Sequence, residues 1–377
     1  MKIGIAGDVF LDRPMTLAET MGPDLRAAIA ECDATFVNFE GPISTDSDAP
    51  AFKTGPNLKQ WPGSLRLLAE AGVTGIGLAN NHALDFGPSN LSATIREAEA
   101  HGLLVAGLHG AAGPSPVLVE TADMTVAMLA FAEEEWCGRL SDPVRIALLD
   151  PIQAARSIKR AKLHADAVIV CLHANNEHST LPHPTLVELC RFLVDMGAAA
   201  VLVAHAHAVS GMELHKGRPI LYGLGNFLFT RPSSSPRWFE GLFCVLDITG
   251  RGDDLRVTAL CHPVTFGPAR GVELAPEPVS RHILNEVDAA SRIIASDASL
   301  AAHFALFAAE HGALFDESLN PWWREGRWKR WAGRHLSKHL RKDPRRQALL
   351  LNFMRCDSHR AAMRQHLETR IDGGVRR

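Results

Sequence analysis

The stretch AAAVLVAHAHAVSG, residues 198–211, joins a run of small and β-branched apolar residues to two histidines, His205 and His207. An apolar run of this length between glycines predicts a buried strand in a sheet that is covered on both faces. Such a strand gives no structural reason to place imidazoles at its end. Taken alone, the pair would be two ordinary loop histidines, so the patterns elsewhere in the chain decide its meaning.

Strand-like and helix-like segments alternate along most of the chain. Strand-like runs include KIGIAG, VTGIGLA and DAVIVCL, and helix-like runs include DLRAAIAEC and PTLVELCRFLVDMG. This alternation predicts an α/β fold with a largely parallel sheet. Residues 115–132 predict a hairpin that turns near Asp123, and the glycine-rich stretch 211–264 predicts antiparallel strands. The expected architecture is a mixed sheet, divided into two and covered by helices.

Strand patterns stop near Pro276, where helical patterns lead into a basic, tryptophan-rich segment. Residues 321–377 have 16 Lys and Arg against 5 Asp and Glu, whereas residues 1–320 have 23 against 37. The C-terminal part is therefore electrostatically distinct from the rest. We predict a catalytic domain over residues 1–275 and a helical, basic extension over residues 276–377.

Four tryptophans lie among the basic residues of this extension: Trp322, Trp323, Trp328 and Trp331. Aromatic residues interleaved with basic ones can stack on single-stranded nucleic acid, and an amphipathic basic helix can lie on an anionic membrane. We favour a third interpretation, in which the tryptophans pack on the acidic domain, because opposite charges within one chain attract each other. Nucleic acid is therefore not a favoured partner.

Composition and cysteine usage favour a soluble protein, with 46% hydrophobic and 21% charged residues. The seven cysteines are scattered and form no Cys-x-x-Cys pair, which predicts reduced thiols rather than a disulfide framework. The chain opens directly with the strand-like MKIGIAGD, and no apolar run approaches the ~20 residues that span a bilayer. We expect a cytoplasmic protein without a transmembrane anchor.

Five separate apolar runs end in residues that can bind a metal ion. These residues are Asp8, Asn38, Glu40, Asn80, Asn81, His82, His173, His205 and His207. Because the carboxyl ends of parallel strands line one edge of a sheet, side chains far apart in sequence would converge there. Each residue alone has a structural alternative, such as a helix cap, a turn former or a hydrogen-bonded core histidine. Five such strand ends together indicate a metal site.

The donor set mixes nitrogen and oxygen and contains no thiolate. Such ligands suit Mn, Fe or Zn in a reactive centre and do not suit a closed structural zinc site. A carboxylate between two histidine-rich groups can bridge two ions, an arrangement that activates water and binds a phosphoryl or similar oxyanion. We therefore expect a divalent metal cofactor of one or two ions, with His205 and His207 among the ligands.

Six motifs of the chain resemble those of a known family. In chain order they are GDVFLDR, VNFEGPI, LANNHALDFG, LHANNE, LVAHAHAVSG and LYGLGNFLF, and they cover about residues 1 to 265. The series is similar to that of the CapA, or poly-γ-glutamate capsule synthesis, family of the calcineurin-like metallophosphoesterase superfamily. The resemblance implies an α/β, metallophosphoesterase-like mixed β-sheet sandwich flanked by helices, followed here by a C-terminal helical extension.

The resemblance also implies roles for individual residues. Asp8 and Glu40 would be metal ligands, with Glu40 in the bridging position, and His82 would protonate the leaving group or hold the substrate anion. The remaining implied metal ligands are Asn81, His173, His205 and His207. At further motif positions, Arg13 has an expected catalytic role. Glu177 and Asn226 have expected substrate-binding roles.

Two parts of the chain depart from the family pattern. Phe10 stands where the superfamily's first motif has a histidine, which leaves one metal with fewer ligands. Ala174 and Asn175 replace the Trp-Gly pair of the family's fourth motif, which bears on substrate specificity. Both departures concern the details of the site rather than membership of the family.

Other polar residues near the motifs are candidates for substrate contact. Arg13, Lys53 and His178 could supply positive charge to an anionic substrate. For Lys53 and His178, solvated surface charge is an equally good explanation. Asn38 is a further candidate for substrate binding.

Asp85 follows the third motif's histidine by three residues. It could orient His82 through a hydrogen bond, as carboxylates beside metal sites do. It could equally cap the helix predicted after it. We include Asp85 among the expected catalytic residues.

The sequence therefore predicts a CapA-family metal-dependent hydrolase that uses metal-activated water. The substrate would be an anionic phosphoester or a glutamyl or peptide-type compound, either a small molecule or a soluble polymer, in a poly-γ-glutamate or related biosynthetic pathway. A biosynthetic synthetase is the expected protein partner. The alternative is a non-catalytic, metal-stabilised accessory subunit of a polyglutamate or amide synthetase.

Overall fold

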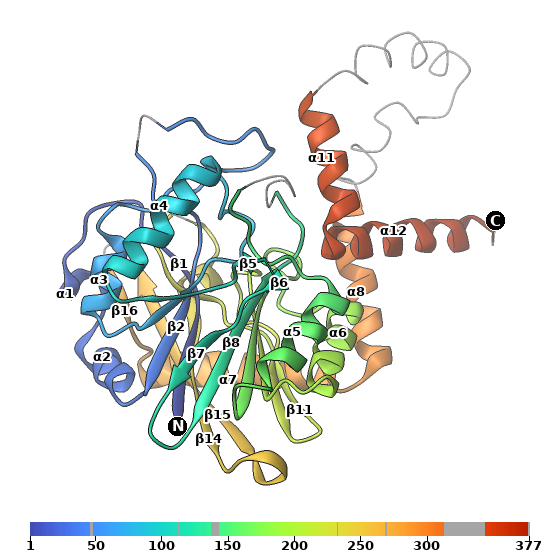
Figure 1. Ribbon diagram of the computed structural model, residues 1–377. Coiled ribbons are helices and arrows are strands. Elements are labelled where there is room, and N and C mark those ends of the chain that lie inside the picture. The colour runs from blue at the N-terminus through green and yellow to red at the C-terminus, as the bar shows by residue number, and fades with distance from the viewer. Residues whose placement is uncertain are drawn as a thin grey trace.

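Two β-sheets pack face to face, and helices cover the outer face of each sheet (Figure 1). The computed structural model describes residues 1–45, 48–111, 113–136, 143–231, 233–267, 270–312 and 344–375. Both sheets contain parallel and antiparallel pairs of strands. The predicted α/β sandwich of mixed sheets flanked by helices is therefore confirmed.

The first sheet has eight strands, in the order β16-β15-β14-β1-β2-β3-β4, with β13 also paired to β1. Its parallel strands and the helices on its outer face are β1 (Lys2–Phe10), α1 (Leu17–Thr20), α2 (Pro23–Ala30), β2 (Ala34–Phe39), α3 (Ser64–Glu70), β3 (Gly75–Gly77), α4 (Gly87–Ala100) and β4 (Leu104–Ala106). The remaining strands are β13 (Asn226–Phe229), β14 (Glu240–Thr249), β15 (Arg256–Gly267) and β16 (Arg270–Leu274). Contrary to the sequence prediction for this region, β13 runs parallel to its partner β1.

The second sheet has six strands, in the order β11-β12-β10-β9-β8-β7. Its elements are β7 (Val117–Glu120), β8 (Thr125–Ala132), α5 (Pro151–Ala161), β9 (Ala167–His173), α6 (Pro184–Asp195), β10 (Ala200–Ala204), β11 (Met212–His215) and β12 (Arg218–Leu221). Strands β8, β9, β10 and β12 are parallel. The hairpin of β7 and β8 turns between Thr121 and Met124, as predicted. Short elements complete the fold: β5 (His109–Gly110), β6 (Gly113–Pro114), η1 (Pro236–Phe239) and η2 (Gly252–Asp254).

The apolar strands of the second sheet are buried on both faces. Val126 and Met128 of β8 lie in the core between the two sheets, whereas Ala127, Leu129 and Phe131 lie in the core under α5 and α6. Burial on both faces explains why these strands are continuous apolar runs rather than alternating ones. It also leaves the strand ends as the place where polar side chains can accumulate.

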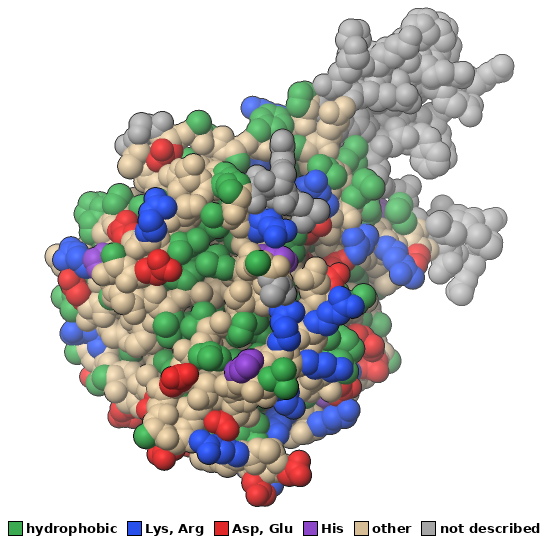
Figure 2. Space-filling model, viewed as in Figure 1, with side chains coloured by type: hydrophobic (Ala, Val, Ile, Leu, Met, Phe, Trp, Pro, Cys, Tyr) green, Lys and Arg blue, Asp and Glu red, His purple; other side chains and the backbone are tan. Residues whose placement is uncertain are grey.

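Helix α5 shows how the sequence sets a surface helix of this fold. The side chain of Asp150 caps its N-terminus by accepting a hydrogen bond of 2.7 Å from the backbone amide of Gln153. Ile158 is fully buried on the face of the helix that packs on the sheet, whereas Lys159 and Arg160 are exposed. Lys and Arg side chains accordingly gather over this helix on the face shown in Figure 2. The helix therefore presents an apolar face to the sheet and a basic face to water.

Helices follow the last strand of the first sheet: α7 (Glu277–Ile294), α8 (Asp297–Glu310), α11 (Pro344–Arg355) and α12 (Asp357–Val375). Ile283 and Val287 of α7 join the core between the sheets, and Leu300 of α8 joins the core under α6. The described residues of the C-terminal part are thus mostly helical, while the domain boundary at residue 275 stays a prediction. The tryptophans of the basic segment lie outside the described residues: Trp322, Trp323, Trp328 and Trp331.

Within the described ranges, every single helix is too short or too polar to cross a membrane. By length and composition alone, one bent pair would qualify. The pair consists of α7 and α8, which meet at an angle of 108°.

The expectation of reduced thiols is wrong for two cysteines. Cys244 of β14 and Cys261 of β15 are directly opposite each other in an antiparallel pair, and they form a disulfide. Their Cα atoms are 4.1 Å apart. The sequence did not reveal this pair because the register of the two strands, rather than the spacing of the cysteines, brings them together.

A tight contact at the start of the first motif yields a stability prediction. A Cβ atom on Gly7 would lie 1.9 Å from the carbonyl oxygen of Gly225, which accepts a hydrogen bond from the Asp8 amide. We expect Gly7→Ala to lower the free energy of unfolding by about 1–3 kcal/mol, because the backbone of Gly225 must move. Urea unfolding measures this difference. Gly77→Ala is the control, since its Cβ meets no atom closer than 3.8 Å, and equal losses in both variants would contradict the argument.

Candidate metal centre

The polar residues at the strand ends converge where the carboxyl edges of the two sheets meet. Asp8 of β1 pairs with Asn38 of β2 and with Asn226 of β13. His173 ends β9 and lies beside the last residue of β10, just before His205. The parallel register therefore brings together side chains that are up to about two hundred residues apart in the sequence.

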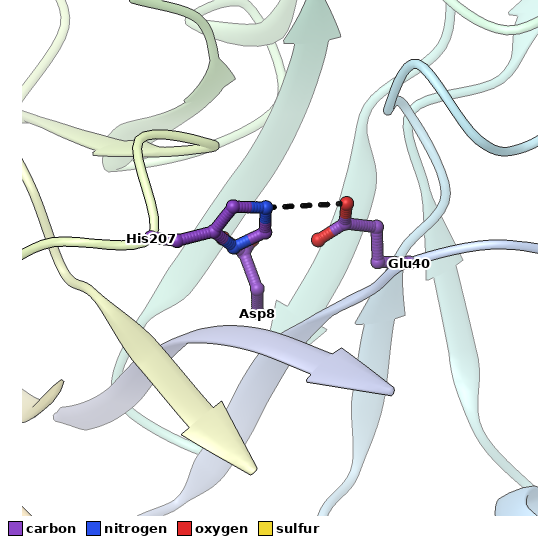
Figure 3. Close-up of side chains that lie close together, drawn as sticks. All are labelled: Asp8, Glu40 and His207. Atoms are coloured by element: carbon purple, nitrogen blue, oxygen red, sulfur yellow. Dashed lines mark ion pairs between the residues drawn. The ribbon is translucent and has the colours of Figure 1, made fainter. Parts of the chain in front are cut away.

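Asp8, Glu40 and His207 form the first group of this centre. One potential ligand atom from each lies within 4.8 Å of the others, and all three residues are buried. The Nε2 atom of His207 is 3.8 Å from Oε1 of Glu40, and its Nδ1 atom is 3.3 Å from Oδ2 of Asp8. Figure 3 shows the carboxylate of Glu40 directed at the imidazole ring of His207. Three donors of nitrogen and oxygen type in this arrangement suit a divalent cation.

The carboxylate of Glu40 provides an independent test of this fit. Glu40 has no exposed surface, and neither of its carboxylate oxygens has a hydrogen-bond partner among the described residues. An ionised carboxylate buried without hydrogen bonds is costly unless a cation compensates it. The orphaned oxygens of Glu40 therefore fit a metal ion beside Asp8 and His207.

The protonation of this group follows from its burial. Burial raises the pKa of Glu40 to about 8, because it disfavours the charged form. Burial alone would lower the pKa of His207, but the nearby carboxylates of Glu40 and Asp8 outweigh it and raise that pKa to about 10. At neutral pH the metal-free centre thus holds protons that a bound cation would displace.

Asn81, His173 and His205 form a second group beside the first. The Nε2 atom of His173 is 2.9 Å from Oδ1 of Asn81 and 2.9 Å from Nδ1 of His205. Asp8 links the two groups, since its Oδ2 atom accepts a hydrogen bond of 3.2 Å from the His205 amide. Its Oδ1 atom accepts one of 2.7 Å from Asn38, which also lies 3.1 Å from His173. His173 thus contacts both other members of the second group, and Asp8 connects that group to the first.

Strained backbone concentrates around these groups. Within the described residues, non-glycine residues with positive φ number six, and four of them lie in or beside the two groups: Trp136, His178, His205 and His207. Such conformations cost free energy and persist only where the surrounding structure imposes them. The strain indicates that the fold is held in a particular arrangement here.

His82 is oriented toward the first group by Asp85. Its Nδ1 atom is 2.6 Å from Oδ2 of Asp85, which also accepts a hydrogen bond of 2.7 Å from the Leu58 amide. The other ring nitrogen, Nε2, is 3.6 Å from Oε1 of Glu40. Burial lowers the pKa of His82, although the hydrogen bond to Asp85 opposes this. Helix α4 has no side-chain hydrogen bond at its N-cap, so the geometry favours the orienting role of Asp85 over the capping role.

An open cleft of about 390 Å³ leads to the centre. Its lining includes three residues from the predicted substrate contacts: Lys53, Glu177 and His178. Lys53 is buried, contacts Asp85 and lies 3.1 Å from Nδ1 of His82, so it is not a solvated surface charge. The cleft places a cation and several imidazoles where an anionic substrate could enter.

Two other predicted residues differ in their placement. Asn226 lies within the centre, since its Oδ1 atom is 2.8 Å from Nδ1 of His207 and its amide nitrogen donates to the Trp238 carbonyl. Arg13 is 45% exposed and contacts the Thr230 carbonyl and Asp12 instead. The contacts of Arg13 give no support to its predicted catalytic role, which stays untested.

Two acidic residues that follow β8 were not predicted from the sequence, and one of them, Glu135, contacts the centre. Glu133 and Glu135 directly follow β8, and Oε2 of Glu135 is 3.3 Å from Nε2 of His205. The motif AEEEW could have revealed them, because β8 is parallel to β9 and ends at the same edge of the sheet. Treating β8 only as half of a hairpin concealed this. The cleft residues contributed by α11 and α12 were also missed, since no local pattern marks them: Leu349, Asn352, Phe353 and His359.

Comparison with known proteins identifies related sequences. Residues 2–231 match the family model described as "Bacterial capsule synthesis protein PGA_cap". A PGA biosynthesis protein CapA from Bacillus subtilis is 24% identical over 78% of this chain and 80% of its own length. A capsule biosynthesis protein CapA from Bacillus anthracis is 30% identical over 51% of this chain and 49% of its own. A probable polyglutamine synthesis accessory protein from Mycobacterium tuberculosis is 26% identical over 52% and 55%. The chain thus spans about half the length of the last two relatives.

Solved structures show a weaker similarity. A calcineurin-like phosphoesterase from Bacillus subtilis has a TM-score of 0.46 and 12% identity, covering 78% of this chain and 99% of that one. A putative 5'-nucleotidase from Staphylococcus aureus has a TM-score of 0.43 and 13% identity, covering 77% and 58%. Similarity at this level carries no argument about activity.

The protonation of Glu40 and His207 predicts how metal affinity depends on pH. A metal ligand must be deprotonated, so a cation has to displace the protons held by these two residues. We expect the association constant for Mn²⁺ to rise between pH 6 and pH 8, by up to about tenfold per pH unit for each displaced proton. Calorimetric titration in two buffers of different ionisation enthalpy measures both the affinity and the protons released. An affinity independent of pH, without proton release, would contradict this assignment.

Proposed function

This chain belongs to the bacterial capsule synthesis family, and we propose that it is a metal-dependent hydrolase of an anionic substrate. The substrate class is a phosphoester or a glutamyl or peptide-type compound in a biosynthetic pathway for poly-γ-glutamate or a related polymer. The relatives named for PGA biosynthesis and capsule biosynthesis motivate the pathway.

The single observation that carries the proposal is the environment of Glu40. Its carboxylate is fully buried, lacks hydrogen-bond partners among the described residues, and faces His207 beside Asp8. A carboxylate in this position is costly, because it faces imidazole nitrogens at 3.6 and 3.8 Å but accepts no hydrogen bond from the described residues. As a metal ligand it would gain a compensating charge.

The chain would hold metal through two adjoining sets of ligands. Asp8, Glu40 and His207 would form one set, and the other would consist of Asn81, His173 and His205. A bound divalent cation would supply Lewis-acid activation of the substrate and of the attacking water. Asn38 and Asn226 would hold Asp8 and His207 in place, through the hydrogen bonds described above.

His82 would move the proton. Its Nδ1 atom is held by Asp85, so Nε2 is free to exchange a proton at the side of the ring that faces Glu40. We propose His82 as the general acid for the leaving group. Lys53, which contacts both His82 and Asp85, would favour a negative charge on the substrate at this end of the cleft.

The cleft accounts for the substrate class. Its volume of about 390 Å³ suits a small molecule or one or two units of a polymer chain. Lys53 and His178 line it together with amides such as Asn176, a combination that can hold carboxylate or phosphate oxygens. The same groups could hold the side-chain carboxylate of a glutamyl residue, which keeps phosphoester and amide substrates both within the proposal.

A second candidate function is that of a metal-stabilised accessory subunit without catalytic activity. The name of the Mycobacterium tuberculosis relative, a probable polyglutamine synthesis accessory protein, favours it. In that case the metal would stabilise the edge where the two sheets meet, and a synthetase would be the partner. Turnover measurements separate the two functions.

We expect the Mn²⁺-loaded protein to hydrolyse either bis(p-nitrophenyl) phosphate or a γ-glutamyl p-nitroanilide, because the centre would activate water. His205→Ala removes a proposed ligand and should abolish that turnover. Release of nitrophenol or nitroaniline measures the rate. His303→Ala, at an exposed position of α8, is the matched control and should keep the wild-type rate. If the wild-type protein turns over neither substrate faster than His205→Ala does, the accessory function is favoured.

A second variant isolates the proton transfer. His82→Gln removes the proposed general acid without removing a proposed ligand, so kcat should fall by about 10²–10⁴-fold while Mn²⁺ affinity stays near the wild-type value. Steady-state kinetics and calorimetry measure the two quantities. A variant with unchanged kcat would eliminate His82 as the acid.

A further inference from the structure

The C-terminal helices α11 and α12 are fastened to the residues that follow β8. Ser358 donates from its hydroxyl group to Oε2 of Glu133 at 2.5 Å, and its amide is 3.4 Å from the same oxygen. Arg355 forms an ion pair of 3.4 Å with Glu134. Residues of the C-terminal helices thus contact successive glutamates at the edge of the second sheet. These helices lie beyond residues 2–231, the part of the chain that matches the family model.

The third glutamate, Glu135, connects these helices to the candidate metal centre. Its Oε1 atom accepts a hydrogen bond of 3.1 Å from the side-chain amide of Asn352 and lies 3.8 Å from Nε2 of His359. Its Oε2 atom lies 3.3 Å from Nε2 of His205 and 3.4 Å from the amide nitrogen of Asn81. One buried carboxylate therefore holds the helices on one side and two proposed ligands on the other.

The orientation of His205 gives this contact a chemical meaning. Its Nδ1 atom faces Nε2 of His173, and the same Nε2 atom contacts Oδ1 of Asn81. Nδ1 therefore lies on the side of the ring where the other proposed ligands are, and it is the nitrogen available to a cation. The opposite nitrogen, Nε2, faces Glu135. A histidine ligand commonly donates its second N–H to a carboxylate, which fixes the tautomer and the ring orientation.

Besides this contact, the ring of His205 is held at its other nitrogen, since Nδ1 lies 2.9 Å from Nε2 of His173. His205 has a backbone φ of +97°, a region that a non-glycine residue rarely adopts. Its amide is held by Asp8, but that bond fixes the backbone rather than the imidazole. If a cation replaced the contact between Nδ1 and His173, the ring direction would depend on the contact of Nε2 with Glu135.

We propose that Glu135 is a positioning residue for His205, and that the C-terminal helices are part of the metal centre because Asn352 holds Glu135 in place. The inference rests on the proposed metal-dependent function and names the part of the chain that tunes it. It assigns to α11 and α12 a role in the site rather than in partner binding alone. The same helices form one wall of the substrate cleft through Asn352, Phe353 and His359.

Mn²⁺ affinity of the full-length protein, measured by calorimetry well below the unfolding temperature, tests the proposal. Glu135→Gln keeps the volume of the side chain but removes the charge that holds Nε2 of His205. Asn352→Ala removes the contact from α11. We expect each variant to bind Mn²⁺ about 10–100-fold more weakly than the wild type, the range known for carboxylates that orient histidine ligands. If two ions bind, the loss should fall on one of them.

Leu351→Ala is the matched control, since Leu351 is next to Asn352 on α11 but is 44% exposed. It should bind Mn²⁺ as the wild type does. Thermal unfolding of the metal-free proteins distinguishes a positioning role from a purely structural one. A purely structural role would lower the unfolding temperature and leave the Mn²⁺ affinity of the folded protein unchanged. If Glu135→Gln has a lower unfolding temperature but wild-type affinity for Mn²⁺, this inference is overturned while the proposed function stands. If Glu135→Gln does not fold, the same outcome in Asn352→Ala overturns it. A wild-type protein that binds no Mn²⁺ overturns the proposed function as well.

Discussion

The burial of two neighbouring carboxyl groups, Asp8 and Glu40, is the constraint on which the site depends. Both carboxylates lie at the carboxyl edge of the first sheet without exposure to water, and only the first is well supplied with hydrogen bonds from neighbouring groups. Two carboxyl groups so close together disfavour each other's ionisation, and burial together with Asp8 raises the pKa of Glu40 to about 8, so Glu40 keeps its proton at neutral pH unless a cation displaces it. The fold therefore buries an acidic pair that a bound cation would stabilise, and neighbouring groups such as Asn38 and the His205 amide hold Asp8 in place.

The two-sheet architecture is stable enough to hold these acidic groups in a buried position. Strands β1 and β2 bring Asp8 and Glu40 from one sheet, while β9 and β10 lead to the histidines of the other. Continuous apolar burial on both faces of these strands fixes their register, because a slip would expose core residues. The rigid strands can then force nearby loop residues such as His205 and His207 into positive φ. Packing stability of the sandwich thus offsets local strain and charge burial at its edge.

The sequence revealed the parts of this arrangement that depend on strand ends. Asp8, Glu40, His173 and His205 could be predicted to converge, because parallel strands in one sheet place their carboxyl ends together. The disulfide of Cys244 and Cys261 could not, because it depends on an antiparallel register that no local pattern specifies. The contacts of Glu135 with Asn352 were hidden for a similar reason, since 217 residues separate the partners and only tertiary packing unites them. The ligand roles of the converging residues remain predictions, because proximity is not coordination.

The C-terminal helices complete a site whose proposed ligands all lie in the segment that matches the family model. The segment that matches the family model contains every proposed metal ligand, yet part of the cleft wall and the support of Glu135 come from helices outside that segment. A chain with the same ligands but a different C-terminal part would present another wall to its substrate and another environment to His205. Because the orientation of a ligand influences both metal affinity and the polarity of the site, relatives with identical motifs could differ in affinity or substrate. We therefore propose that the chemistry of the site depends jointly on the sheet edge that carries the proposed ligands and on helices α11 and α12, which lie outside the family segment.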